Sequence, residues 1–168
     1  MSDKSNVMTF AGGLWQRVFK LVAAEYPEIQ TQHMYVDALC MHMARDPKQF
    51  DVIVTNNMFG DIITDLAAAL QGGLGMAASG NIHPGKTSMF EPVHGSAPPF
   101  AGKNTANPVG AISTAAMMLD HLGFNKEAAR INQAVLESVR QKKTTADIGG
   151  SLGTKEAAAW IAEAVART

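Results

Sequence analysis

Apolar residues recur at helical spacing in the first part of the chain. Residues 10–26 are predicted to form a helix that Pro27 ends. Its apolar positions are three or four residues apart: Leu14, Val18, Leu21 and Val22. A second amphipathic helix is predicted over residues 58–71, where Gly72 and Gly73 end it.

Two short runs between these helices have strand character. Residues 29–36 alternate loosely between apolar and polar side chains, which predicts a strand. Residues 51–55 are a β-branched run and predict a buried strand. Asp37 is predicted to cap a short helix over residues 38–45.

The pattern changes after residue 71. Residues 72–108 are rich in glycine and proline and keep no helical period, which predicts a long irregular segment with a use of its own. Three helices are predicted to follow, over residues 108–122, 126–142 and 154–166. Strands alternating with helices early in the chain, followed by helices alone, indicate an α/β fold.

Composition narrows the possible functions. The 168 residues carry a net charge of −1, and only 17% are charged. This balance argues against a nucleic-acid-binding protein, which would show a basic stripe. The apolar runs are too short to span a membrane, and the single cysteine, Cys40, cannot form an internal disulfide. We therefore expect a cytoplasmic globular protein with neither a membrane nor a nucleic-acid partner.

Asp61 and Asp65 are the first candidates for chemistry. They are four residues apart on the predicted helix, so both carboxylates project from one face and repel each other. A divalent cation would offset that repulsion, and a set of oxygen ligands favours Mg²⁺ or Mn²⁺ over zinc. Two solvated aspartates are an equally good interpretation of the spacing alone.

The loop over residues 91–98 is the second candidate. The run Gly95-Ser96-Ala97 has small side chains, which allow backbone N–H groups to approach a phosphate. His94 could stack on an adenine or hydrogen-bond to a ribose. A turn-rich loop with a structural histidine is the alternative, and it is the better one without further context.

Seven segments together resemble the metal-dependent decarboxylating dehydrogenases of the isocitrate/3-isopropylmalate dehydrogenase family. Their order and spacing agree with the family across nearly the whole chain. They are Asp3-Lys-Ser-Asn6, Tyr35-Val-Asp-Ala38, Phe50-Asp-Val-Ile-Val-Thr55, Asn57-Met-Phe-Gly-Asp-Ile-Ile-Thr-Asp65, Glu91-Pro-Val-His-Gly-Ser-Ala-Pro98, Gly102-Lys-Asn-Thr-Ala-Asn-Pro108 and Asp147-Ile-Gly-Gly150. These segments are most similar in sequence to the 3-isopropylmalate members of the family. The isocitrate, homoisocitrate and tartrate members remain as alternatives.

The resemblance implies an isocitrate/isopropylmalate dehydrogenase-like α/β fold of which this chain is the C-terminal half. Residues 1–75 would be the second half of a small, dimer-forming domain that carries metal carboxylates. Residues 76–168 would be the C-terminal part of a large NAD-binding domain. An arginine cluster that clamps the substrate carboxylates would lie in the absent N-terminal half.

The resemblance also implies roles for individual residues. Asp37, Asp61 and Asp65 would bind Mg²⁺ or Mn²⁺, and Asp37 would also be one of the catalytic residues. Lys4 would be the general base or proton relay. The residues implied to contact the dinucleotide are Asn6 at the nicotinamide end, and His94, Gly95, Ser96, Ala97 and Asn107 around the adenosine and phosphates.

The implied reaction is the oxidative decarboxylation of a 2-hydroxy dicarboxylic acid with NAD, as in leucine biosynthesis. The metal carboxylates would come from two subunits, which implies a homodimer, and a separate polypeptide could supply the N-terminal half. Pro99-Phe100 stands where NAD-using members carry an aspartate and NADP-using members carry Lys-Tyr, so NADP stays open. The alternative is a catalytically inactive remnant that folds or dimerises.

Overall fold

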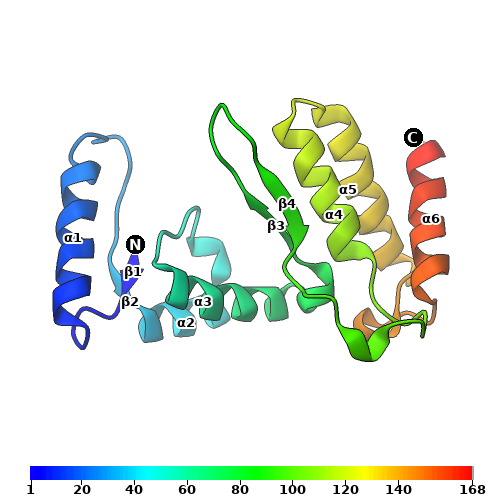
Figure 1. The fold of residues 1–168 in the computed structure, drawn as a ribbon, viewed down its shortest axis with the longest axis horizontal. Coiled ribbons are helices and arrows are strands. Elements are labelled where there is room, and N and C mark those ends of the chain that lie inside the picture. Colours follow the sequence, from blue (N-terminus) through cyan, green and yellow to red (C-terminus); the bar gives the residue numbers. More distant parts are fainter. Residues whose placement is uncertain (168) are drawn as a thin grey trace. The chain divides into compact units, whose positions relative to one another are not determined.

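The computed structural model describes residues 1–167. Backbone contacts divide the chain into two compact units, Met1–Ala67 and the described residues from Ala68 onward. The helix α3 (Asn57–Leu70) runs across this division. Figure 1 shows the elements in order along the chain. This division follows from the contacts between backbone positions. The assignment of residues 1–75 to a small family domain and of residues 76–168 to a large one stays a prediction.

The first unit consists of a two-stranded parallel sheet with helices around it. Strand β1 (Ser2–Asp3) pairs with β2 (Met34–Tyr35), and the helices are α1 (Thr9–Ala23), α2 (Val36–Arg45) and the first part of α3. Its core is a cluster of four buried apolar side chains from α2 and α3: Leu39, Met43, Phe59 and Ile63. Cys40 packs against this cluster, as a small apolar side chain would.

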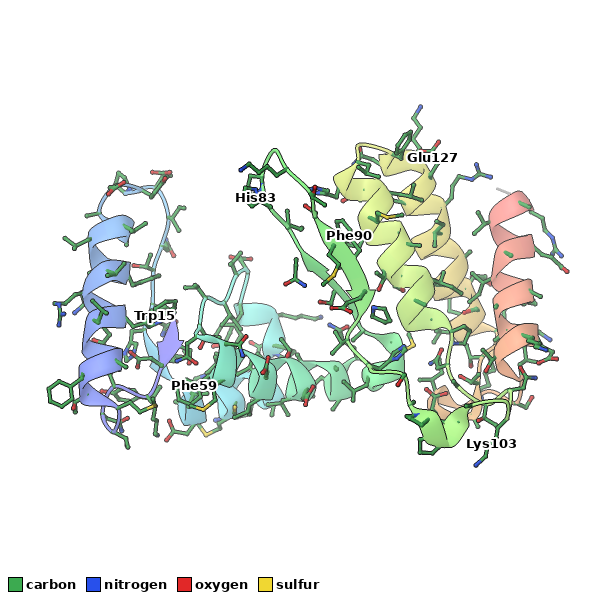
Figure 2. The ribbon with its side chains drawn as sticks, viewed as in Figure 1. Trp15, Phe59, His83, Phe90, Lys103 and Glu127 are labelled. Carbon is green, nitrogen blue, oxygen red and sulfur yellow. The ribbon has the colours of Figure 1, made fainter. Side chains whose placement is uncertain are left out.

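The second unit is a β-hairpin followed by three helices. Strands β3 (Ala78–Asn81) and β4 (Met89–Pro92) are antiparallel and pack against α4 (Val109–His121), α5 (Asn125–Arg140) packs on α4, and α6 (Thr154–Arg167) packs on α5. Figure 2 shows Phe90 between β4 and α4, where its ring centroid is 5.4 Å from that of His121. The core of the three helices includes Val109, Ala134 and Ile161.

The predicted helices are confirmed to within a few residues, whereas the first predicted strand is confirmed only in part and the second is wrong. Residues 29–33 are irregular, so only β2 remains of the first predicted strand, and residues 51–55 form no strand. A strand is defined by hydrogen bonds to a neighbour, and the only backbone bond of residues 51–55 to β1 runs from Ser2 N–H to the carbonyl of Val54, 2.9 Å.

Two further predictions need correction. The segment 72–108 is not irregular throughout, since it contains the β3–β4 hairpin. Asp37 does not cap α2, because the helix begins at Val36 and Asp37 stands in its first turn. An acidic side chain at that place still stabilises the positive end of the helix dipole. No helix in the described part of the chain is long and apolar enough to cross a membrane.

Candidate functional site

Lys4 and Asp37 form an ion pair although 33 residues separate them in sequence. The Nζ atom of Lys4 is 2.6 Å from Oδ2 of Asp37. Lys4 directly follows β1 and Asp37 follows β2, so the parallel pairing of the two strands brings both side chains to the same end of the sheet. The hydrogen bond from Lys4 lowers the pKa of Asp37, which keeps that carboxylate ionised. The structure thus brings together the predicted base and one predicted metal ligand.

A buried network next to Lys4 was not predicted from the sequence. The side chain of Asp3 is only 2% exposed. Its Oδ1 atom accepts a hydrogen bond from the N–H of Ser5 (3.1 Å) and lies 2.9 Å from Nε2 of His33. Gln16 on α1 donates a 2.6 Å hydrogen bond to the hydroxyl of Ser5. These bonds fix the residues on both sides of Lys4 and therefore the start of its side chain.

The charge of Asp3 is held by this network. Burial raises the pKa of Asp3, but the hydrogen bonds from His33, Ser5 and Gln16 outweigh it, and the net pKa lies below the ordinary 3.8. The only sign of this in the sequence was that Asp3 begins the Asp3–Asn6 segment, which carried the family resemblance. The contact of Asp3 with His33, 30 residues away in sequence, could not be predicted from this segment.

The variant Asp3→Asn is expected to lower the free energy of unfolding by about 1–2 kcal/mol at pH 7, since a charged acceptor in a buried network is lost. A depressed pKa stabilises the folded state above the unfolded value of 3.8, and that stabilisation is lost as pH falls through the folded pKa. The difference from the parent chain should therefore shrink below about pH 4. Urea denaturation from pH 7 to pH 2.5 measures it, with the exposed Glu25→Gln as control. A difference that stays constant over this range would contradict the assigned charge.

Asp61 and Asp65 lie on the exposed side of α3, opposite the buried Phe59 and Ile63. Asp61 receives one long hydrogen bond, 3.4 Å from Nδ2 of Asn57. Among the described residues nothing hydrogen-bonds to the Asp65 carboxylate, and no three acidic, histidine or cysteine side chains gather closely enough to hold a metal ion. One chain therefore presents these carboxylates without completing a metal site.

Asn6 is exposed in the turn that follows Lys4. The N–H groups of Val7 and Met8 both donate to the carbonyl of Lys4, at 2.9 and 2.8 Å, and so close this turn. The Asn6 side chain is left free of the turn's own hydrogen bonds, and its predicted contact with a nicotinamide stays a prediction.

The loop after β4 presents unpaired backbone donors. In the described structure, the N–H groups of Gly95, Ser96 and Ala97 have no hydrogen-bond partner. Ala97 has a left-handed backbone with φ of 43°, and a Cβ atom on Gly95 would meet no atom within 4 Å. Successive free N–H groups beside a left-handed residue form a concave site for an anion.

His94 has one satisfied and one unsatisfied ring nitrogen. Its Nδ1 is 3.0 Å from the carbonyl oxygen of Gly95, and because a carbonyl only accepts, we assign the proton to Nδ1. The Nε2 atom is then an acceptor, and it is buried with no partner among the described residues. The ring packs closely on the backbone of Gly110, where a Cβ atom would lie 3.3 Å from it.

Asn107 is held by a partner that the sequence did not reveal. Its Nδ2 donates to Oδ2 of Asp147 at 2.9 Å, and its Oδ1 accepts from the N–H of Val109 at 2.9 Å. Asp147 in turn accepts a hydrogen bond from the hydroxyl of Thr145. Asp147 belongs to a segment that carried the family resemblance, and that segment was the only available signal. The Asn107 side chain is thus fixed at the start of α4.

The comparisons with known proteins agree on one family. The family model described as isocitrate/isopropylmalate dehydrogenase matches residues 1–165. The 3-isopropylmalate dehydrogenase of Streptomyces coelicolor is 52% identical over 161 residues, which are 92% of this chain and 46% of that protein. That of Thermobifida fusca is 50% identical over 165 residues, 97% of this chain and 46% of that protein.

A solved structure gives the same result for the fold. The crystal structure of isocitrate dehydrogenase from Methylococcus capsulatus matches with a TM-score of 0.92 and 42% identity, over 98% of this chain and 50% of that one. The chain thus spans about half the length of the relatives it matches. The predicted fold is confirmed, and the chain belongs to the isocitrate/isopropylmalate dehydrogenase family.

Proposed function

We propose that this chain contributes the metal and dinucleotide sites of an NAD-dependent dehydrogenase that oxidatively decarboxylates a 2-hydroxy dicarboxylic acid. The 3-isopropylmalate type of substrate is favoured by relatives at 52% and 50% identity that carry this name, which would place the reaction in leucine biosynthesis. Isocitrate is the competing substrate, supported by the solved relative at 42% identity.

The Lys4–Asp37 ion pair is the observation that carries the proposal. A base must lie within reach of the proton that it removes, and lysine acts as a base only after its own ammonium group has lost a proton, which a nearby metal cation would favour. Lys4 is one-quarter exposed and reaches Asp37, a metal ligand in this proposal, at 2.6 Å. Lys4 would take the proton of the substrate hydroxyl and later return one to the carbon from which CO₂ leaves. The Asp3 network would keep its backbone in place.

The acidic residues fit a hard divalent cation. Asp37, Asp61 and Asp65 supply only oxygen, and the last two are exposed with spare lone pairs. When bound, Mg²⁺ or Mn²⁺ supplies a Lewis acid that stabilises negative charge on the substrate oxygens. Since one chain does not bring the three together, we propose that a homodimer completes the site, with α3 in the interface.

The loop of residues 94–97 fits a dinucleotide. The free N–H groups of Gly95, Ser96 and Ala97 would bind a phosphate, and Nε2 of His94 would accept a hydrogen bond from the nucleoside. Asn107 would border this site from its fixed place before α4. When bound, NAD accepts the hydride, and NADP is the alternative because Pro99-Phe100 carries neither an acid nor a cation.

A second candidate is a chain that binds metal and nucleotide without turnover. It is favoured by the coverage of only 46% of the relatives' length and by the incomplete metal site within the described residues. An assay with Mn²⁺, NAD and 3-isopropylmalate separates the two candidates, since NADH absorbance at 340 nm rises only if this chain alone suffices.

The metal site is tested by titrating Mn²⁺ into the chain and following the affinity by calorimetry. Asp61→Asn and Asp65→Asn are each expected to weaken binding at least about tenfold, because each removes a charged ligand. Asp46→Asn, which neutralises an acid at the end of α2, is the matched control and should bind as the parent does. Equal affinity in all four proteins would refute the assigned ligands.

A further inference from the structure

The first turn of α6 fastens the chain beside the proposed nucleotide site. Asn104 lies in the stretch that joins the N–H groups of residues 95–97 to Asn107. Its carbonyl accepts a hydrogen bond from the N–H of Thr154 at 3.0 Å, and its Oδ1 accepts one from the N–H of Lys155 at 2.9 Å. A residue 51 positions before Lys155 therefore pairs two N–H groups that α6 cannot pair within itself.

Two further hydrogen bonds complete this attachment. Nδ2 of Asn104 donates to Oε2 of Glu156 at 2.8 Å, and the hydroxyl of Thr154 donates to the carbonyl of Ala106 at 2.6 Å. The bond from Asn104 lowers the pKa of Glu156, which favours the ionised carboxylate as the acceptor. A Cβ atom on Gly153 would overlap both partners of this bond, so the contact requires a glycine there.

Asparagine fits position 104 in both its backbone and its side chain. The backbone is left-handed, with φ of 54°, which asparagine adopts more readily than most residues other than glycine. Its amide supplies an acceptor for α6 and a donor for Glu156 at the same time. Aspartate would keep the backbone and the acceptor, but it would place a second carboxylate against that of Glu156.

We propose that Asn104 is a positioning residue of the nucleotide site, which fastens residues 104–107 to α6 and so holds Asn107 in place. The carbonyl of Ala106 is held directly before Asn107, whose own Oδ1 accepts from the N–H of Val109 at 2.9 Å. The attachment also fixes the far end of the loop that begins with residues 95–97. This inference rests on the proposed function only where that function assigns Asn107 to the nucleotide.

The test compares Asn104→Asp with the parent chain by hydrogen-exchange NMR. The amide proton of Val109 is expected to exchange at least about tenfold faster in the variant, because the repelling carboxylates release the segment before α4. The amide of Ala134, in the core of the three helices, should keep its rate. Combining Asn104→Asp with Glu156→Gln should restore the rate of Val109, because the glutamine amide can donate to the aspartate.

Asn125→Asp is the matched control. Nδ2 of Asn125 donates to Oδ1 of Asp120 at 2.7 Å, so this change also sets two carboxylates against each other, but in the last turn of α4. It should leave the exchange of Val109 unchanged. An unaltered Val109 rate in Asn104→Asp would overturn the proposal. Equal acceleration of Val109 and Ala134 would overturn it as well, since it would indicate a general loss of stability.

Titration with ADP reports on the proposed function separately. The affinity, followed by the NMR shifts of the N–H groups of residues 95–97, is expected to fall at least about fivefold in Asn104→Asp and to recover in the double variant. Equal affinity of the parent and Asn104→Asp would contradict a positioning role. If the parent does not bind ADP, the proposed nucleotide site is wrong, whereas the exchange of Val109 still decides whether Asn104 holds Asn107 in place.

Discussion

The variant Gly12→Ala is expected to lower the free energy of unfolding by about 2–3 kcal/mol, as overpacking at a buried contact does. Gly12 lies in α1 where the turn after β1 crosses the helix. A Cβ atom there would lie 2.5 Å from Cβ and 2.6 Å from Cα of Ser5, and backbone cannot give way as a side chain can. Since Ser5 follows Lys4, relief of the clash would also move the Lys4–Asp37 pair. Chemical denaturation measures the loss.

Gly13→Ala is the matched control for this prediction. Gly13 is the next residue of the same helix, but its Cβ atom would meet only the end of the Arg17 side chain, 3.7 Å away. Helix propensity then dominates, and alanine should stabilise the chain by up to about 1 kcal/mol. The two neighbouring substitutions thus have opposite expected signs. A gain in stability from both would show that Ser5 does not pack on α1 as described.

Gly150→Ala is expected to destabilise the chain by about 3 kcal/mol or more. A Cβ atom at Gly150 would overlap the carbonyl group and the hydroxyl of Thr144, which is 1% exposed. The turn is also tied by the hydrogen bond from Gly150 N–H to the carbonyl of Thr145, 3.0 Å. This turn carries Asp147, so its displacement would release Asn107 as well. Thermal unfolding of the variant and the parent measures the effect.

Gly149→Asn provides the comparison at the adjacent residue. Gly149 has a left-handed backbone with φ of 82°, which asparagine adopts at low cost, and its Cβ atom would meet nothing within 4 Å. A loss below about 1 kcal/mol is expected. If asparagine at 149 is as damaging as alanine at 150, backbone conformation rather than contact with Thr144 governs this turn.

The helices could be predicted because each needs only its own residues. The spacing of apolar positions places α1, α3 and the last three helices within a few residues, with Pro27 and Gly72 near two of the ends. The strands could not be predicted in this way. Residues 51–55 have every local property of a strand, yet Val54 makes the only ladder bond to β1. A strand forms only when a second strand supplies backbone hydrogen bonds, and a short stretch of sequence does not show which segment that will be.

The candidate site shows the same difference between what the sequence predicts and what only the structure shows. The sequence identified Lys4, Asp37, Asp61 and Asp65 as residues of interest through a family resemblance, and side-chain identity alone makes a hard-cation site chemically reasonable. It gave no sign that Asp3 is buried against His33, or that Asp147 holds Asn107. These partners are 30 and 40 residues apart along the chain.

By itself the sequence determined the family, the helices and the identity of the groups available for chemistry, because these depend on residue types and on short-range spacing. The tertiary structure decided which groups meet. Pairing of β1 with β2 sets the 2.6 Å contact between Lys4 and Asp37. Such contacts follow from strand register, which joins segments distant in sequence and is fixed only when the whole sheet is assembled.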